Sequence, residues 1–411
     1  MTTENPAELA ILVFTAITLV GIFVILKLTK DKTKKVSTLR IFIQIVAVVA
    51  VFMGLILGPF GDPRWLPLGI APRDRLLGSS LLGYQFPDGL SVPILACYYP
   101  NGRTVTCAIW QIQAYIYPNW NAMRGYAVFY STTGLEKLAI VFGSIIVMAL
   151  VLGRFFCGWL CPLGLYMDLM IRIRKVFGRR HLSVSKKTNT ALGQLRYVII
   201  ALFLILSVIF SSYAIFGTEL IPGTVPGGPY GNDVGIVGAI NEPFCLFCPM
   251  RPLCVLIESG LGYMDFSYVT KLTYNLHAPL YSVGFYLTSI NLAVLVSVTI
   301  LALAYRRFWC RICPLGGLTA LFSTFTPFKQ IALTRLHKDE EKCTKCGVCK
   351  RVCPTQVTEV YDNKGGDVTV SGCMLCFRCV EMCPYKDTLK VKIAGKTIFK
   401  SRNWLEPSKS D

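Results

Sequence analysis

The sequence predicts an integral membrane bundle of about five transmembrane α-helices, followed by a smaller α+β domain at the C-terminus. The composition is the first reason, because 53% of the 411 residues are hydrophobic and only 16% are charged, whereas a soluble domain carries about 25% charge. The mean hydropathy of +0.53 agrees with this. The second reason is a set of five long apolar stretches, and the third is a polar, cysteine-rich final segment. These features exclude a wholly soluble or disordered chain.

The apolar stretches are the predicted membrane spans, because a helix needs about 20 mostly apolar residues to cross a bilayer. They lie near residues 9–26, 41–61, 135–153, 197–218 and 283–304. The transmembrane domain is therefore expected to occupy residues 1–330. The C-terminal domain should follow at 331–400, with a tail at 401–411.

The net charge of +19 is explained by topology and does not require nucleic acid as a partner. Lys and Arg concentrate in the segments between alternate spans and in the C-terminal domain, as they do on the cytoplasmic side of membrane proteins. The opening residues, MTTENPAELA, contain no basic residue, so the first stretch is expected to be a retained span and not a signal peptide. The predicted orientation has the N-terminus outside and the C-terminus inside.

The C-terminal domain contains the pattern C-x2-C-x2-C-x3-C-P twice. Both copies resemble a bacterial-type two-cluster ferredoxin, in which the fourth cysteine of each run ligates the other 4Fe–4S cluster. This rule assigns one cluster to Cys343, Cys346, Cys349 and Cys383, and the second to Cys373, Cys376, Cys379 and Cys353. A pair of zinc sites is the alternative.

A second repeat reads R-F-F-C-G-W-L-C-P-L-G from Arg154 and R-F-W-C-R-I-C-P-L-G from Arg307. Duplicated halves of this kind recur in membrane folds. The two copies could supply two ligands each to one shared 4Fe–4S cluster, which would be bound by Cys157, Cys161, Cys310 and Cys313. The alternative is that these are buried structural cysteines. Arg154 and Arg307 are either interfacial anchors or groups that stabilise the charge of the cluster.

Five further cysteines lie in the predicted outer segments: Cys97, Cys107, Cys245, Cys248 and Cys254. A disulfide between Cys97 and Cys107 would close a hairpin on an oxidising face. Alternatively, Cys245, Cys248 and Cys254 could hold a cluster with one of these two as fourth ligand. Both interpretations remain open at this point.

Haem is not expected, because the chain has only 3 histidines and a membrane haem needs axial ligands that face each other. His181, His277 and His337 lie in different predicted segments, and C-x-x-C-H does not occur. No Gly-rich nucleotide loop or catalytic triad is present either. Asp168, in a segment that otherwise looks like a basic amphipathic helix, is assigned no chemistry.

Taken together, the Cys-Pro-Leu-Gly repeats and the two-cluster tail resemble the NapH/NosR/CcoG group of membrane-bound polyferredoxins, over roughly residues 135–385. The resemblance implies a multi-pass protein of a prokaryotic plasma membrane, with its ferredoxin domain in the cytoplasm. It implies an electron-transfer subunit of an oxidoreductase complex. On one side this subunit would exchange electrons with a membrane carrier, such as the quinone pool, or with an outer-face partner. On the other side it would exchange electrons with cytoplasmic redox partners. A reductase for metalloenzyme maturation and a cluster-based redox sensor are the alternatives. The second repeat departs from the family in having two residues, not three, between its cysteines.

Overall fold

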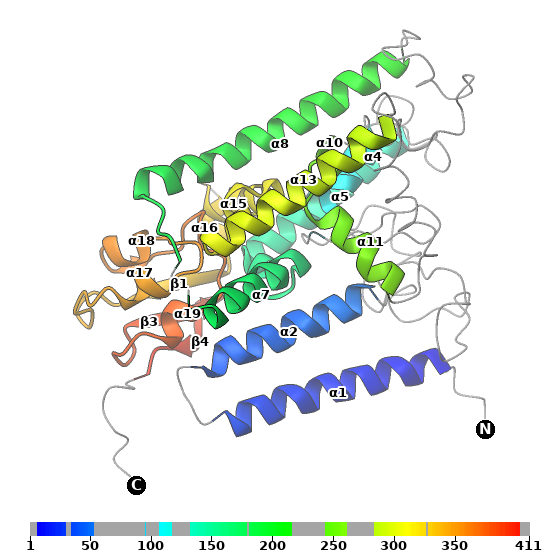
Figure 1. Cartoon of the computed structure of the whole chain (residues 1–411). Coiled ribbons are helices and arrows are strands. Elements are labelled where there is room, and N and C mark those ends of the chain that lie inside the picture. The colour runs from blue at the N-terminus through cyan, green and yellow to red at the C-terminus, as the bar shows by residue number, and fades with distance from the viewer. Residues whose placement is uncertain are drawn as a thin grey trace. The chain divides into compact units, whose positions relative to one another are not determined.

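The computed structural model of the chain describes residues 6–29, 34–52, 95, 107–116, 132–178, 181–215, 243–260, 283–325 and 328–402 (Figure 1). The chain divides into two compact units. The first comprises residues 1–12, 49–145 and 198–299, and the second comprises 13–48, 146–197 and 300–411.

Helices make up most of the described chain, and the longest lie before residue 305. Their bounds are α1 Pro6–Leu28, α2 Lys35–Phe52, α4 Ala108–Ile116, α5 Thr132–Leu152, α6 Phe155–Trp159, α7 Pro162–Val176, α8 Lys186–Ile215, α10 Pro243–Leu246, α11 Met250–Gly260, α13 Val283–Ala304, α14 Trp309–Ile312, α15 Pro314–Thr324 and α16 Phe328–Ile331.

The predicted bundle of about five membrane spans is wrong. In the described part of the chain, one helical stretch is long and apolar enough to cross a membrane, Lys186–Ile209 of α8. Three other apolar helical stretches, Phe14–Leu28, Leu138–Leu152 and Ser289–Ala304, have between 10 and 17 residues, which is short of the length that spans hydrocarbon. The structure is a mixed helical protein that also contains a small sheet.

The sheet lies in the C-terminal part of the second unit. Its strands are β1 Thr334–Lys338, β2 Gly366–Asp367, β3 Leu389–Ile393 and β4 Lys396–Lys400. They are ordered β2-β1-β3-β4, and every neighbouring pair is antiparallel. The short helices of this domain are α17 Val348–Val352, α18 Glu359–Asp362 and α19 Arg378–Glu381. A core of valines and leucines joins sheet and helices, including Leu336, Val368, Val380 and Val391.

The two Cys-Pro-Leu-Gly copies fold alike within the second unit. Each consists of a short helix, a cysteine followed by proline, and a longer helix, so that α6 leads into α7 and α14 leads into α15. The residue before a proline is driven towards extended backbone, and Cys161 and Cys313 have ψ angles of 122° and 121°. The prolines Pro162 and Pro314 then occupy the first helical position, which suits their fixed φ.

In the first unit, α4 and α10 pack together around apolar side chains. Ile109 and Ile112 of α4 and Phe244 of α10 are at most 2% exposed. The ring of Phe244 meets that of Phe203 edge-on, with centroids 5.5 Å apart. The described cysteines of this unit lie in or next to α4, α10 and α11.

Candidate metal centres

The loops that carry the C-terminal cysteines have the same unusual backbone in both copies. Lys345 and Gly347 flank Cys346 with φ angles of 52° and 71°, and Leu375 and Phe377 flank Cys376 with φ angles of 49° and 58°. For non-glycine residues this left-handed conformation is strained, and such strain persists where a site requires it. It curls each loop so that its three cysteines converge, before α17 and α19 lead to the fourth.

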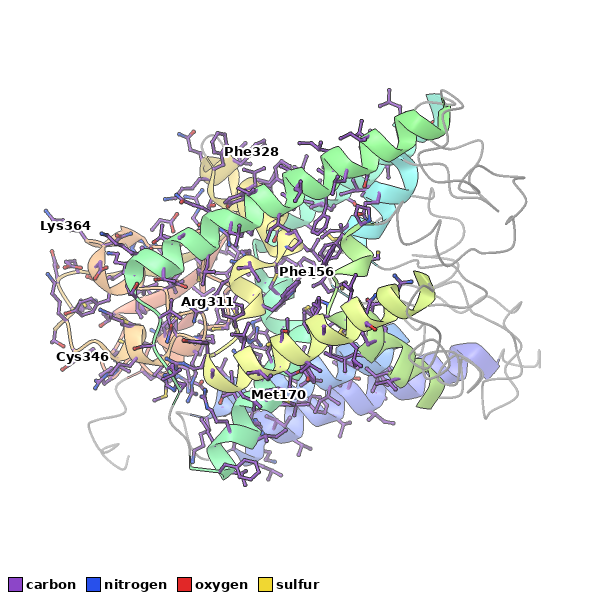
Figure 2. All side chains as sticks on the ribbon, turned by 45° about the horizontal axis from the view of Figure 1, so that its top comes forward. Phe156, Met170, Arg311, Phe328, Cys346 and Lys364 are labelled. Atoms are coloured by element: carbon purple, nitrogen blue, oxygen red, sulfur yellow. The ribbon has the colours of Figure 1, made fainter. Side chains whose placement is uncertain are left out.

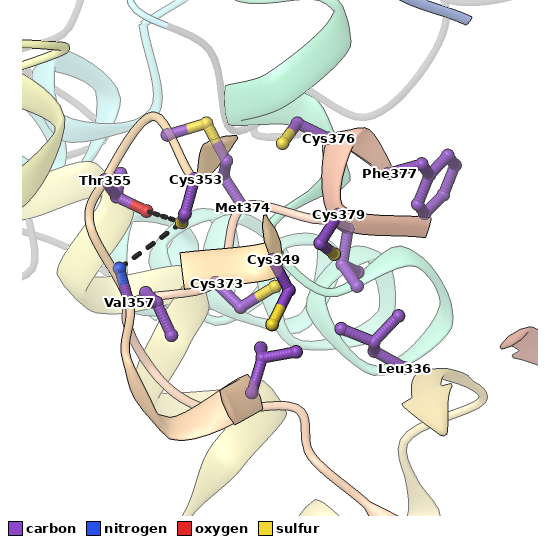
Figure 3. Close-up of a pocket in the computed structure, with 12 residues that line it drawn as sticks. Leu336, Cys349, Cys353, Thr355, Val357, Cys373, Met374, Cys376, Phe377 and Cys379 are labelled. Carbon is purple, nitrogen blue, oxygen red and sulfur yellow. Dashed lines mark hydrogen bonds between the residues drawn. The ribbon is translucent and has the colours of Figure 1, made fainter. Parts of the chain in front are cut away.

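One group of four cysteines surrounds a hollow in the C-terminal domain (Figure 3). Cys353, Cys373, Cys376 and Cys379 line it, with Cys349 and apolar side chains including Leu336 and Val357 completing the wall. Burial raises the pKa of the Cys373 thiol to about 12, and the charges of Cys376 and Cys353 also raise it. Burial likewise raises the pKa of Cys379, where Cys373, Cys376 and Cys353 contribute. The structure thus brings together the four residues that the crossover rule groups.

The other predicted group is closer to solvent. Burial raises the pKa of Cys349 to about 11, and Cys343, Cys346 and Cys383 are the neighbouring thiols that raise it further. Cys346 is exposed at the edge of the domain (Figure 2). Cys383, in contrast, is buried. Greater solvent exposure is one of the factors that sets cluster potential, so the two sites offer different environments.

The cysteines of the Cys-Pro repeats also come together. Burial raises the pKa of Cys313 well above its ordinary value, and the thiols of Cys157, Cys161 and Cys310 contribute to the rise. Cys161, Cys310 and Cys313 are buried, and Cys157 is half-buried. Two segments about 150 residues apart in sequence therefore build one group of four thiols.

The chemistry of these three groups fits iron–sulfur clusters. In the described part of the chain, no three His, Cys, Asp or Glu side chains lie close enough to bind a single metal ion. A 4Fe–4S cluster has a different requirement, because each of its cysteines ligates a separate iron and the four sulfurs are correspondingly further apart. The thiolate is the ligating form, so metal has to displace protons from these buried thiols.

The repeat site lies directly against the second C-terminal group. Cys310, Met374 and Cys376 form one buried contact cluster, and Cys157 packs against it. The indole Nε1 of Trp159 donates a hydrogen bond to the carbonyl of Leu375 at 3.0 Å. A Cβ on Gly158 would lie 2.6 Å from the carbonyl oxygen of Met374, so only glycine permits this approach of α6 to the loop.

Two buried arginines cross-link the repeats reciprocally. Arg154, of the first copy, donates to the carbonyl of Cys310 in the second at 3.0 Å. Arg307, of the second copy, donates to the carbonyl of Cys157 in the first at 3.0 Å and to the Met374 sulfur at 3.1 Å. The two arginines are 2% and 0% exposed.

The glycine of the second Cys-Pro-Leu-Gly copy makes room for the arginine of the first, and the glycine of the first copy lies in contact with the arginine of the second. A Cβ on Gly316 would lie 2.6 Å from Arg154 Nη2, and one on Gly164 would lie 3.4 Å from Arg307 Nη1. Each copy of the repeat therefore has an arginine three residues before its first cysteine, and this arginine binds to the other copy.

Asp168 is the residue that sequence reasoning missed. Its carboxylate accepts Arg307 Nε at 2.9 Å and Arg40 Nη2 at 3.0 Å, and it also pairs with Arg307 Nη2. Burial alone would raise the pKa of Asp168, but the charges of Arg307 and Arg40 outweigh it and hold the pKa below the ordinary value. One signal in the sequence could have identified it: Asp168 is a single acidic residue in a basic segment. A buried charge needs a partner of opposite charge, and the segment offers several.

Arg154 has no such carboxylate: no acidic side chain of the described chain forms an ion pair with it. Its Nη1 instead donates to the Ser371 carbonyl at 2.6 Å. A buried cation without an acidic partner beside four thiols fits a site that carries negative charge, as thiolate-bound clusters do.

Other residues considered in the sequence are not members of these three groups. His181 precedes α8, and His337 is on β1. Cys107, Cys245, Cys248 and Cys254 are buried in the first unit. Cys97 and His277 lie outside the described residues, so the predicted hairpin disulfide does too.

Comparison with known proteins agrees with this geometry. A 4Fe-4S binding domain model matches residues 137–183 and 288–330, which contain both Cys-Pro copies. A 4Fe-4S dicluster domain model matches residues 335–384, which contain the eight C-terminal cysteines. No solved structure matches the chain.

The relatives that are similar over more than half of this chain include one from Methanocaldococcus jannaschii and two from Escherichia coli. The uncharacterized protein MJ0750 of Methanocaldococcus jannaschii is 30% identical over 64% of this chain and 80% of its own length. YccM of Escherichia coli, provisionally named an electron transport protein, is 26% identical over 64% of this chain and 58% of its own length. The ferredoxin-type protein NapH of Escherichia coli is 24% identical over 56% of this chain and 59% of its own length.

The chain thus spans somewhat less than two thirds of YccM and NapH. The shared cysteine domains confirm the resemblance predicted from the sequence: the chain belongs to the NapH-like polyferredoxins, and it is an iron–sulfur electron transport protein.

Proposed function

We propose that this chain binds three 4Fe–4S clusters and transfers electrons between a membrane carrier and redox partner proteins. Cys343, Cys346, Cys349 and Cys383 would hold the first cluster. Cys353, Cys373, Cys376 and Cys379 would hold the second, and the Cys-Pro repeats would hold the third through Cys157, Cys161, Cys310 and Cys313. The converging thiols of each group support these assignments.

The buried contact between Cys310, Met374 and Cys376 carries the proposal. Cys310 belongs to the repeat site and Cys376 to the second C-terminal site, so the two sites share a wall. Cys379 is similarly influenced by the charge of Cys349, which belongs to the first site. A 4Fe–4S cluster, when bound, accepts and returns a single electron. Because electron transfer weakens steeply with distance, adjoining sites are what a relay requires.

Aromatic side chains shield the region between the repeats and the C-terminal loops. The rings of Phe155 and Trp159 stack with centroids 5.2 Å apart, and Phe377 lies 5.5 Å from Trp159. Phe377 follows Cys376 in sequence, and Cys376 is buried, while the buried Arg154 and Arg307 provide positive charge. Solvent access and local charge both tune cluster potential, so these residues would set the direction in which electrons move.

The apolar stretch Lys186–Ile209 of α8 supports attachment to a membrane. Several of its large apolar side chains face away from the protein, including Val198, Leu202 and Ile205 at 51% to 61% exposure. Exposed apolar surface of this kind marks an interaction with lipid or another protein. A reduced quinone is the membrane carrier that we propose as electron donor.

The test compares variants of the full-length protein purified without oxygen. Cys157→Ala and Cys310→Ala should each remove about four iron atoms per chain and leave the electron paramagnetic resonance (EPR) signals of the C-terminal clusters intact. Cys346→Ala is the reciprocal variant: it makes the same chemical change at the exposed C-terminal site, so it should disturb the first C-terminal cluster and leave the repeat cluster in place. Unchanged iron in the first two variants would show that the shared site is wrong.

A second arm adds a reduced quinone analogue and follows bleaching of the cluster absorption. Wild-type protein should bleach fully, whereas in Cys310→Ala the C-terminal clusters should stay oxidised. Bleaching at the wild-type rate in Cys310→Ala would contradict a relay through the repeat site. No bleaching in the wild type would contradict the quinone as donor and leave the cluster assignments standing.

A further inference from the structure

Four cysteines of the first unit are buried as deeply as the groups described above. Cys107, Cys245, Cys248 and Cys254 are 2%, 5%, 3% and 0% exposed. They belong to none of the three proposed cluster sites. Neither matched domain model includes them, because those models cover residues 137–183, 288–330 and 335–384.

The local structure around Cys248 repeats that of the Cys-Pro copies. The short helix α10 carries Cys245, the dipeptide Cys248–Pro249 follows, and α11 begins at Met250. In the second repeat, α14 carries Cys310, Cys313–Pro314 follows, and α15 begins at the proline. In both, the carbonyl of the cysteine before proline accepts a backbone N–H from the helix that follows, from Arg251 at 3.3 Å and from Gly317 at 2.9 Å.

Cys107 is connected to this element through α4. It immediately precedes the first residue of α4, a helix that packs on α10 (Figure 1). The amide oxygen of Gln113, on α4, accepts the backbone N–H of Phe244, next to Cys245, at 3.1 Å. Gln113 is fully buried, so this hydrogen bond fixes α4 against the cysteine-bearing turn.

The amide nitrogen Nε2 of Gln113 is evidence for a ligand. In the described part of the chain, its Nε2 is buried without a hydrogen-bond partner. A buried donor normally has an acceptor, and one without an acceptor is evidence for a bound ion or ligand. The inorganic and cysteine sulfurs of a cluster accept hydrogen bonds from amides, which are among the factors that tune cluster potential.

We infer that Cys107, Cys245, Cys248 and Cys254 bind a fourth 4Fe–4S cluster and that the Gln113 amide donates a hydrogen bond to it. Four buried thiolates are the ligand set of such a cluster, and the short helix–Cys–Pro–helix element is the one that carries cysteines in the repeats. The inference stands apart from the relay proposed above, since it shares no ligand with those three sites.

The first measurement needs no variant: iron and acid-labile sulfide in the full chain purified without oxygen. Four clusters require about sixteen iron atoms per chain, and three require about twelve. Cys107→Ala and Cys254→Ala should each lower the iron content by about four atoms and leave the EPR signals of the C-terminal clusters unchanged. Cys97→Ala is the matched control, and it should retain all the iron.

A Gln113→Leu variant tests the hydrogen bond alone, because it removes the amide donor and keeps all four cysteine ligands. It should keep the full iron content and shift the reduction midpoint of one cluster, the same one that is lost in Cys107→Ala. A shift confined to another cluster would contradict the role of Gln113.

Three results would overturn the inference. One is about twelve iron atoms in the wild type, and another is zinc in place of iron at this site. The third is an equal loss of iron in Cys97→Ala and Cys107→Ala, which would favour a structural disulfide between these two. If Cys107→Ala does not accumulate, Cys107→Ser and the wild-type iron count still decide the question.

Discussion

The C-terminal cluster loops and the Cys-Pro repeats reach the same end, four converging thiols, by different means. In the C-terminal domain the loop backbone determines the site. Residues with left-handed backbone conformation on both sides of Cys346 and Cys376 turn three cysteines inward within seven residues. In the repeats the cysteines come in pairs from distant segments, and buried side chains hold the pairs together. Arg154 and Arg307 each bind the backbone of the other copy. The C-terminal sites therefore depend mainly on the backbone conformation of their loops. The composite site, formed by the two Cys-Pro repeats, depends on buried charged side chains.

The largest expected effect is at Arg307, because its removal breaks the composite site at its most buried point. Arg307→Met leaves Asp168 with Arg40 as its charged partner and removes the hydrogen bond to Cys157. Breaking a buried ion pair costs about 3–5 kcal/mol. We expect the repeat cluster to be lost, measured as a fall of about four iron atoms per chain, with the C-terminal clusters retained.

Arg172→Met is the control, since Arg172 lies on the exposed side of the same helix as Asp168. It should keep every cluster. If Arg307→Met also retained its iron, the site formed by the two repeats would not depend on the arginine exchange.

A smaller effect is expected at Gly316. An added Cβ would lie 2.6 Å from Arg154 Nη2, so Gly316→Ala must displace the guanidinium, at a cost of about 1–3 kcal/mol for overpacking. Partial loss of the repeat cluster, seen as a shortened half-life of its absorption on warming, should result. Gly193→Ala, on α8 where an added Cβ meets nothing within 4 Å, should leave that half-life unchanged or extend it.

The smallest effect is expected in the C-terminal loops. Lys345 is exposed with a φ of 52°, a conformation that glycine adopts without strain. Lys345→Gly should therefore raise the melting temperature slightly, with a gain of about 1 kcal/mol in stability. The ion pair with Glu340, 3.5 Å long at the surface, contributes little to offset this.

Lys342→Gly provides the comparison, because Lys342 is exposed but has an ordinary backbone conformation. It should give no gain. A stabilisation equal to that of Lys345→Gly would mean that the loop backbone is not strained.

Sequence spacing could predict the grouping of the cysteines because that information is local. The C-x2-C-x2-C-x3-C-P runs specified which thiols meet, and the structure places those thiols around common sites; their role as cluster ligands stays a prediction. The C-terminal sheet contains the second run between β2 and β3. The pairing of the two Cys-Pro copies could be inferred only because one repeats the other.

The membrane prediction failed for a physical reason. Hydropathy counts apolar residues but does not show how long an apolar helix is. Phe14–Leu28, Leu138–Leu152 and Ser289–Ala304 are apolar helical stretches of between 10 and 17 residues, and a helix needs about 20 such residues to span hydrocarbon. The arginine exchange was equally invisible in the sequence, because it depends on which backbone carbonyl each side chain meets in three dimensions.

The reciprocal arginines also determine when the site can form during synthesis. The ribosome makes Arg154, Cys157 and Cys161 long before it makes the second copy, and the Cys310 carbonyl that Arg154 binds does not yet exist. Arg307, which neutralises Asp168 and holds Cys157, emerges only three residues before Cys310. Completion of this group of four thiols is therefore a late event in biogenesis. A chain truncated before residue 307 would leave two cysteines without their partner thiols and Asp168 with Arg40 as its remaining ion-pair partner.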